Sequence, residues 1–497
     1  MPVIAPDESG TAAPGPAASP AVPGTQASWR SCPEVPQQIV GRGASGMRYE
    51  CASVAVPRDW ATPKSGETYD VQMIRIRSTN QENRIGSLVL NPGGPGASGI
   101  EIAVGLSYGQ KLGGLPTEIT DRFDIVGFDP RGVDRSSPIR CISRTDQDAL
   151  FAADPDPVSQ ADFDEVAALN KKIVEGCGDK YGAQLPLFST EQAARDMDAV
   201  RSAVGDQKLT YLGYSYGTLL GATYAQLFPK NIRALVLDGA VDPTEPYIAR
   251  NEAQAKGFER AFTNFSQWCA RTPAQCPIQP DARGAVTDAL AKSRVDPVAG
   301  PDGRDAEPGW IFTGVAQALY SQTQWPSLAK SIDSLRRGDA KGIFELADAY
   351  ARREPGGRYT NLFDANMVVN CADADETPTV QQIRTLQSQW RAKYPLFGSS
   401  LAMGMLPCAL WPGKHDPYPT GAATGAPPIV VVGTTGDPAT PYENTADLAG
   451  MLGTGQVLTW EGEGHTAYPS TPCIVRAVDG YLIDLTVPTV GLRCPAR

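Results

Sequence analysis

The pattern of apolar and polar residues along the chain predicts an α/β fold. Short apolar runs bounded by Gly, Pro or Asp are typical of strands, and eight of them occur, at 52–57, 70–77, 86–92, 123–129, 209–214, 234–239, 428–433 and 456–462. The later runs are apolar throughout, as in strands that are buried on both faces of a parallel sheet. Segments with helical periodicity, such as 190–205 and 216–229, lie between the runs. This alternation predicts an eight-stranded, mostly parallel sheet covered by helices.

The spacing of the strands is interrupted once. Residues 240–427 separate the sixth predicted strand from the seventh, and this stretch is far too long for a loop. Much of it has helical periodicity, for example at 251–270 and 379–394. We therefore predict a helical cap at 246–410, inserted after the sixth strand, between two core segments at 31–245 and 411–497.

The first 30 residues differ in composition from the rest of the chain. They are rich in Pro, Ala and Gly, which predicts a disordered leader at 1–30. Residues 1–29 contain no Lys, no Arg and no apolar core, so they do not form an intact signal peptide. Either an export signal preceded this leader or there was none.

Charge and hydropathy exclude several kinds of partner. The formal net charge is -11, and no run of Lys or Arg stands out, which argues against nucleic acids and anionic membrane surfaces. No segment reaches the roughly 18 consecutive apolar residues that suggest a helix across a bilayer.

Ten scattered cysteines favour an exported protein with five disulfides. The chain has no C-x-x-C motif and only two histidines, so neither a zinc site nor any other metal or cofactor is expected. Cys269–Cys276 and Cys473–Cys494 are the pairs that the sequence favours most, while the full connectivity stays open. The alternative is a cytosolic protein whose cysteines are reduced.

The pattern G-x-S-x-G, which marks a serine nucleophile at a strand-to-helix turn, occurs twice. "GYSYG" centres on Ser215 and "GLSYG" centres on Ser107. Only Ser215 has an apolar run before it and an Ala- and Leu-rich helical segment after it. We therefore predict Ser215 as the nucleophile, and we interpret Ser107 as a serine in a loop or at the end of a helix.

A serine hydroxyl needs a base, and a carboxylate must orient that base. His465, in "EGEGHTAY", directly follows the last predicted strand, whereas His415 lies among prolines in "WPGKHDPYP". Asp437 follows the seventh strand, and Asp238, at the end of the sixth, is the alternative. We favour Asp437 and His465, because Ser, Asp, His is the chain order of α/β-hydrolases.

The chemistry also needs backbone N–H groups that stabilise an oxyanion. "NPGGPGASG" at 91–99 follows the third strand, and its glycines allow close approach of backbone to substrate. We predict one donor at Gly94, with Gly93 as the alternative, and the other at Tyr216, which follows the nucleophile.

Five motifs together resemble a known family. "NPGGPGASG", "DIVGFDPRGVDRSS", "YLGYSYGTLLGATYAQLFP", "GTTGDPATP" and "GEGHT" occur in the order found in exported tripeptidyl aminopeptidase-like serine hydrolases related to proline iminopeptidases. The resemblance covers about 45–245 and 410–497. It implies an α/β-hydrolase fold with a helical cap, no metal, the roles given above for Ser215, Asp437 and His465, and a structural role for Arg131. The sequence departs from the family at Asp134, where the family usually has glycine.

The resemblance implies the release of short peptides or amino acids from a free peptide N-terminus. A carboxylate would then bind the substrate ammonium, and the candidates are Asp373, Asp375, Glu376 and Glu101, with Glu245 as a further possibility. The same machinery cleaves esters, so an esterase or lactonase acting on small neutral compounds is the alternative. A non-catalytic binding protein on this fold is a more distant one.

Overall fold

The computed structural model describes residues 26–32 and 46–496, and the fold is described for these residues. Residues 1–25 of the predicted leader lie outside them. Its last residues contact the body of the protein, because Ala27 donates a backbone hydrogen bond to Ala203 O and Arg30 begins the first strand.

The described residues contain one ten-stranded sheet with the order β1-β2-β3-β5-β4-β6-β7-β8-β9-β10. The first three strands pair antiparallel with their neighbours, and the remaining pairings are parallel. The strands are β1 (Arg30–Ser31), β2 (Met47–Pro57), β3 (Thr68–Ser78), β4 (Gly86–Asn91), β5 (Phe123–Phe128), β6 (Leu209–Tyr214), β7 (Ile232–Asp238), β8 (Ile429–Gly436), β9 (Gly455–Glu463) and β10 (Arg493–Pro495).

The predicted number of eight strands is too low. The eight apolar runs correspond to β2–β9, while β1 and β10 add one short strand at each edge of the sheet. Their two and three residues are too few to give an apolar pattern. Disulfides lie at both edges instead, since Cys32 follows β1 and bonds to Cys51 in β2, and Cys494 in β10 bonds to Cys473.

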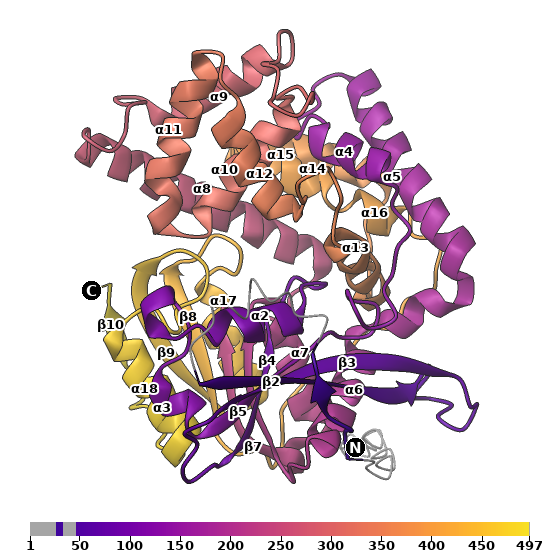
Figure 1. Ribbon diagram of the computed structural model, residues 1–497. Coiled ribbons are helices and arrows are strands. Elements are labelled where there is room, and N and C mark those ends of the chain that lie inside the picture. Colours follow the sequence, from indigo (N-terminus) through magenta and orange to yellow (C-terminus); the bar gives the residue numbers. More distant parts are fainter. Residues whose placement is uncertain (1–25, 33–45, 497) are drawn as a thin grey trace, which may run out of the picture.

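Helices cover both faces of the sheet (Figure 1). One face packs against α6 (Thr190–Ala203), α7 (Tyr216–Leu227) and α17 (Glu443–Leu452). The other packs against α2 (Gly99–Leu106), α3 (Thr117–Thr120) and α18 (Pro472–Asp484). β4, β5 and β6 are buried at every position, which explains their uninterrupted apolar sequence.

A helical cap stands over the carboxyl edge of the parallel strands (Figure 1). It is built from the segment between β7 and β8 and has its own apolar cores. Its helices are α8 (Tyr247–Arg271), α9 (Ala282–Ser293), α10 (Pro308–Leu319), α11 (Trp325–Arg336), α12 (Lys341–Ala351), α13 (Leu362–Asp373), α14 (Val380–Lys393), α15 (Gly398–Met403) and α16 (Leu406–Ala409).

A second segment packs with the cap helices, although the boundaries predicted from the sequence include it in the core segment at 31–245. α4 (Arg144–Ala152) contacts α10, and α5 (Gln160–Tyr181) contacts α16. Phe151 and Phe163 belong to the apolar cores of the cap. The cap is therefore assembled from two insertions, one before β6 and one after β7.

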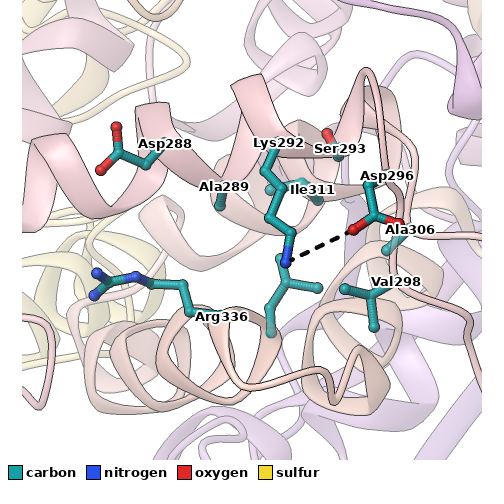
Figure 2. Close-up of a pocket in the computed structure, with 10 residues that line it drawn as sticks. Asp288, Ala289, Lys292, Ser293, Asp296, Val298, Ala306, Ile311 and Arg336 are labelled. Carbon is teal, nitrogen blue, oxygen red and sulfur yellow. Dashed lines mark ion pairs between the residues drawn. The ribbon is translucent and has the colours of Figure 1, made fainter.

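Short helical elements complete the described chain at Gln110–Leu112, Gly182–Phe188, Pro229–Asn231 and Gln322–Gln324. A pocket opens in the cap between α9, α10 and α11, with Lys292 and Asp296 paired beside it (Figure 2). None of its lining residues belongs to the predicted site. No helix in the described part of the chain is long and apolar enough to cross a membrane.

All ten cysteines form disulfides, as the sequence predicted. The two pairs favoured from the sequence, Cys269–Cys276 and Cys473–Cys494, are confirmed. The other three pairs are Cys32–Cys51, Cys141–Cys177 and Cys371–Cys408.

Arg131 forms a fully buried ion pair beneath the site. Its guanidinium contacts both carboxylate oxygens of Asp196, at 2.5 and 2.7 Å, and neither side chain is exposed. The remaining N–H groups bind carbonyl oxygens of Pro57, Arg58 and Leu187. One side chain thus connects α6, the end of β2 and the loop after β5.

We predict that Arg131→Ala lowers the free energy of unfolding by about 3–5 kcal/mol, because it leaves the buried Asp196 carboxylate without its partner. Denaturant unfolding of the purified variant measures this change. Lys171→Ala is the matched control, since it removes an ion pair with Glu175 in which both side chains are more than half exposed. The control is expected to change stability by less than about 1 kcal/mol, and an equal effect of both variants would refute the prediction.

Candidate active site

Ser215 occupies a sharp turn between β6 and α7. Its φ is 56° and its ψ is -125°, a combination that residues with a side chain rarely adopt. A Cβ at Gly213 would clash with Gly217 O, and a Cβ at Gly217 would lie 2.9 Å from Asn91 O. The two glycines of the motif therefore permit the turn, which leaves Ser215 partly exposed at the carboxyl end of β6.

The serine turn and His465 lie against two consecutive residues, Asp238 and Gly239. The amide of Ser215 donates to Asp238 O at 2.8 Å. A Cβ on the next residue, Gly239, would lie 3.3 Å from Cε1 of His465. The imidazole therefore packs beside the strand end that holds the serine turn.

Asp437 orients the imidazole of His465. Nδ1 of His465 lies 2.9 Å from each oxygen of the Asp437 carboxylate. The carboxylate is fully buried and also accepts backbone N–H groups of Ala439, Thr440 and Thr466. These contacts hold the carboxylate in one position and leave Nε2 on the other side of the ring.

The electrostatic surroundings favour a protonated His465. Burial alone would lower the pKa of the imidazole, but the charge and hydrogen bond of Asp437, together with the charge of Asp238, raise it. The net result is a pKa above the ordinary value of 6.5. A histidine tuned in this way is a stronger acceptor for a proton from a neighbouring hydroxyl.

The cap contributes directly to the position of His465. The backbone N–H of His465 donates to Tyr320 O at 2.9 Å. The Tyr320 ring, just after α10, meets the imidazole edge to face with 5.2 Å between the ring centres. Tyr320 could not be predicted from the sequence, because nothing local distinguishes it from the other aromatic residues of the cap.

The alternative residues have other contacts. Asp238 is buried and accepts the backbone N–H groups of Ala467 and Tyr468, and burial raises the pKa of its carboxyl to about 7. Nδ1 of His415 donates to Cys371 O at 2.7 Å. Ser107 is buried at the end of α2, where its hydroxyl donates to Val104 O. Asp238 thus fixes the loop that follows His465, and it does not contact Nδ1.

Two backbone segments meet beside Ser215, the loop after β4 and the start of α7. A Cβ at Gly93 would lie 2.9 Å from both Ser215 Cβ and Tyr216 N, so only glycine fits there. The amide of Gly93 is occupied by Asn91 Oδ1 at 2.9 Å. Gly94 follows with φ 110°, and Tyr216 is the first residue of α7, where a helix leaves its N–H groups free. The glycine-rich loop at 91–99, called the glycine loop below, thus faces the start of α7.

The predicted carboxylates are placed very differently. Asp375 and Glu376 are exposed beyond the end of α13, and Glu101 is exposed on the first turn of α2. Asp373 is buried, and Thr190 donates to both of its oxygens. Glu245 is half-buried, and its Oε2 has no hydrogen-bond partner in the described residues.

Asp134 occupies a left-handed turn, with φ 38°. Its amide donates to Asn361 Oδ1 at 2.8 Å, and its carboxylate pairs with Arg135. The residue that departs from the family pattern thus keeps a backbone conformation that glycine adopts more easily. Among the residues that the structure describes, no group of three or more His, Cys, Asp or Glu side chains is arranged to hold a metal ion.

A mostly parallel α/β sheet with a serine at a strand-to-helix turn and an imidazole–carboxylate pair beside it is typical of serine hydrolases. A family model described as the alpha/beta hydrolase fold matches residues 86–472, and the chain belongs to this family.

Three similar proteins extend the result from the fold to the kind of reaction. The chain is 40% identical over 469 residues to serine protease Hip1 of Mycobacterium tuberculosis, with 89% of this chain and 87% of that protein covered. It is 37% identical over 511 residues to carboxylesterase B of the same organism, with 99% and 95% covered. It is 31% identical over 441 residues to the tripeptidyl aminopeptidase of Streptomyces coelicolor, with 87% and 81% covered. The protein is therefore an enzyme, a serine hydrolase of the α/β hydrolase fold.

We predict that kcat/KM falls as the pH drops through the raised pKa of His465, because only the neutral imidazole accepts a proton. The midpoint is expected above pH 6.5, the ordinary pKa of the group. Asp437→Asn removes the charge that raises this pKa, so the acid limb should move to lower pH while kcat drops on the order of 10⁴-fold. A pH–rate profile of both proteins measures these changes, and an acid limb at the same pH in the variant would contradict them.

Proposed function

We propose that the protein is an exported aminopeptidase that releases short peptides or amino acids from a free peptide N-terminus. Ser215 is the nucleophile, His465 the general base and acid, and Asp437 the carboxylate that orients His465. The observation that carries the proposal is the Asp437–His465 pair, with Nδ1 at 2.9 Å from both oxygens, beside the strand end that holds the Ser215 turn. The two relatives named as a serine protease and a tripeptidyl aminopeptidase support the choice of peptides as substrates.

The reaction follows from this geometry. His465 accepts the proton from the Ser215 hydroxyl while Oγ attacks the scissile carbonyl. The N–H groups of Gly94 and Tyr216 stabilise the oxyanion, and the positive start of α7 adds to their effect. His465 then protonates the leaving amine, which departs and leaves an ester on Ser215. A water molecule, deprotonated by His465, cleaves this ester and frees the enzyme.

Among the predicted carboxylates we favour Glu101 for binding the substrate ammonium. It is exposed, and its helix α2 begins at the end of the glycine loop that carries Gly94. Asp375 and Glu376 remain further candidates because they are exposed, whereas the oxygens of Asp373 are occupied by Thr190.

The second candidate function is a carboxylesterase that acts on small neutral esters. One observation favours it. The relative whose alignment covers 99% of this chain is named carboxylesterase B. An esterase would use the same three residues and the same oxyanion donors, but it would need no carboxylate for an ammonium group.

We also propose that the enzyme acts outside the cytoplasm, either secreted or associated with the cell envelope. The five disulfides support this location, because such bonds persist in oxidising compartments.

We predict that a tripeptide anilide with a free amine is cleaved and that its N-acetylated form is cleaved at least about 10-fold more slowly, since acetylation removes a charge-assisted contact worth about 1.5–3 kcal/mol and adds bulk. Release of the aniline product measures both rates. Equal rates on the two substrates would refute the aminopeptidase and favour the esterase. Ser215→Ala is expected to abolish both activities, and an active variant would refute the role of the nucleophile.

We predict that Glu101→Gln raises KM for the free-amine substrate about 10-fold with little change in kcat, because it removes a charge that binds substrate and transition state alike. Steady-state kinetics with purified enzyme measures both constants. Glu118→Gln is the matched control, an exposed acid in the first turn of α3. If Glu101→Gln and the control have the same small effect, Glu101 is not the ammonium site.

A further inference from the structure

Helix α13 of the cap contacts the glycine loop that carries one proposed oxyanion donor. A Cβ at Gly96 would lie 2.5 Å from Leu362 O and 3.0 Å from Asn366 N, so the loop lies directly on the first turns of the helix. The side-chain amide of Asn366 donates to Pro95 O at 3.1 Å. The position of the loop therefore depends on α13.

The other end of α13 is connected to the residue that carries the second proposed donor. Asp373, the last residue of the helix, accepts the backbone N–H of Thr190 at 2.7 Å and the Thr190 hydroxyl at 2.6 Å. Thr190 Oγ1 also lies 2.6 Å from the phenol oxygen of Tyr216. All three residues are buried. A chain of hydrogen bonds thus runs from the cap to the residue after Ser215.

When it is ionised, the Asp373 carboxylate gives this chain a direction. Since Thr190 donates its single hydroxyl proton to Asp373, the Tyr216 phenol must donate to Thr190. Burial raises the pKa of the Asp373 carboxyl to about 7, while Thr190 and Arg250 lower it and Asp416 raises it. Tyr418, two residues after Asp416, also interacts electrostatically with Asp373. Above neutral pH the carboxylate therefore holds both hydroxyl groups in one orientation.

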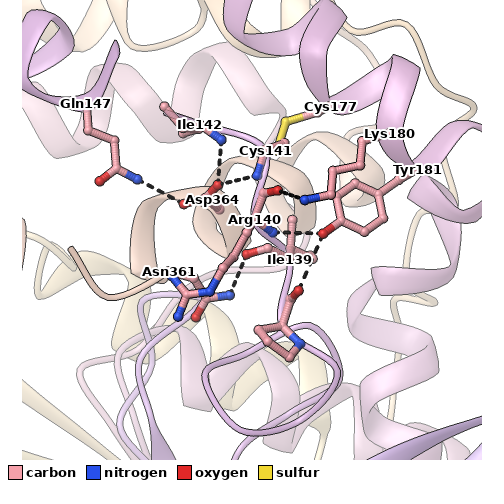
Figure 3. Close-up of a disulfide and its surroundings, with 11 residues drawn as sticks. Ile139, Arg140, Cys141, Ile142, Gln147, Cys177, Lys180, Tyr181, Asn361 and Asp364 are labelled. Atoms are coloured by element: carbon pink, nitrogen blue, oxygen red, sulfur yellow. Dashed lines mark hydrogen bonds between the residues drawn. A yellow bond between two sulfur atoms is a disulfide. The ribbon is translucent and has the colours of Figure 1, made fainter. Parts of the chain in front are cut away.

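Helix α13 is itself fixed at both ends. At its start, Asp364 accepts the amides of Cys141 and Ile142, and Asn361 donates to Ile139 O (Figure 3). Cys141 is bonded to Cys177 of α5 in the same view. Near its other end, Cys371 forms a disulfide with Cys408 of α16. Hydrogen bonds at its start and a disulfide near its end therefore anchor α13 at both ends.

We propose that Asp373 and Thr190 are positioning residues that hold Tyr216, and that α13 sets the distance between the two oxyanion donors. The proposal rests on the proposed function, in which Gly94 and Tyr216 supply these donors. It gives Asp373 a role different from the ammonium binding predicted from the sequence, since both of its oxygens are occupied. It also explains how the strained backbone at Ser215 keeps its conformation, because such strain persists only where surrounding contacts determine it.

The test uses Thr190→Val, which keeps the shape and the backbone N–H of Thr190 but removes the hydroxyl, and Thr190→Ser, which keeps the hydroxyl. We expect Thr190→Val to lower kcat about 10- to 100-fold, since donors misplaced by a fraction of an ångström lose transition-state stabilisation. KM should stay within about 2-fold of the original enzyme. Thr190→Ser should retain most of the activity. Kinetics with the free-amine tripeptide anilide measures all of these constants.

Thr120→Val is the matched control, because Thr120 is also buried but, among the described residues, its hydroxyl bonds only Thr117 O of its own helix. This control should leave kcat unchanged. Unchanged kcat in Thr190→Val, a loss confined to KM, or an equal loss in Thr190→Ser would each overturn the proposal. If Thr190→Val does not fold, Tyr216→Phe breaks the same chain at its other end and is expected to lower kcat in the same way, with normal kcat overturning the proposal.

Failure of the positioning role can be told apart from failure of the proposed function. An inactive Ser215→Ala together with a fully active Thr190→Val would leave the nucleophile in place and reject the role of Asp373 and Thr190. An active Ser215→Ala would reject the function on which the proposal rests.

Discussion

The structure of the site depends on one backbone turn, in which Ser215 adopts a positive φ between β6 and α7. Such a conformation is unfavourable for serine, and it persists only because neighbouring segments determine it. Gly213, Gly217 and Gly93 pack so closely around the turn that no side chain fits at their positions. Asp238 O accepts the hydrogen bond of the serine amide, and the next residue, Gly239, packs against the imidazole of His465. Segments at the ends of β4, β6, β7 and β9 thereby meet at the serine turn.

The cap contacts residues of the site directly. Tyr320 accepts the backbone N–H of His465, and Asn366 binds the loop that carries Gly94. Asp373 connects to Tyr216 through Thr190. The helical insertion thus contacts His465 and the loop of one proposed oxyanion donor directly, and it reaches the other donor through Thr190 of α6. A change in the cap that leaves the sheet intact can therefore still alter the chemistry.

Buried charges in this protein are compensated by specific partners. Arg131 and Asp196 form an ion pair without solvent, and backbone amides surround Asp437. Asp238 and Asp373 are also buried, and burial raises the pKa of each carboxyl to about 7 although hydrogen bonds oppose the shift. Asp238 and Asp373 each connect segments that are more than 180 residues apart. Asp437 binds His465, in the loop after β9.

The sequence by itself determined the central strands, the strand-to-helix context of Ser215 and two of the disulfides, because these features depend on neighbours in the chain. Apolar runs reveal β2–β9, and a seven-residue spacing pairs Cys269 with Cys276. The chain order already favoured Asp437 over Asp238 as the partner of His465. Only the tertiary structure decided that α4 and α5 join the cap, that Asp373 faces Thr190 and that Tyr320 meets His465. It also added β1 and β10, which are too short to show a pattern. These features depend on contacts between residues far apart in the chain, and an isolated acid, threonine or tyrosine gives no local signal of its partner.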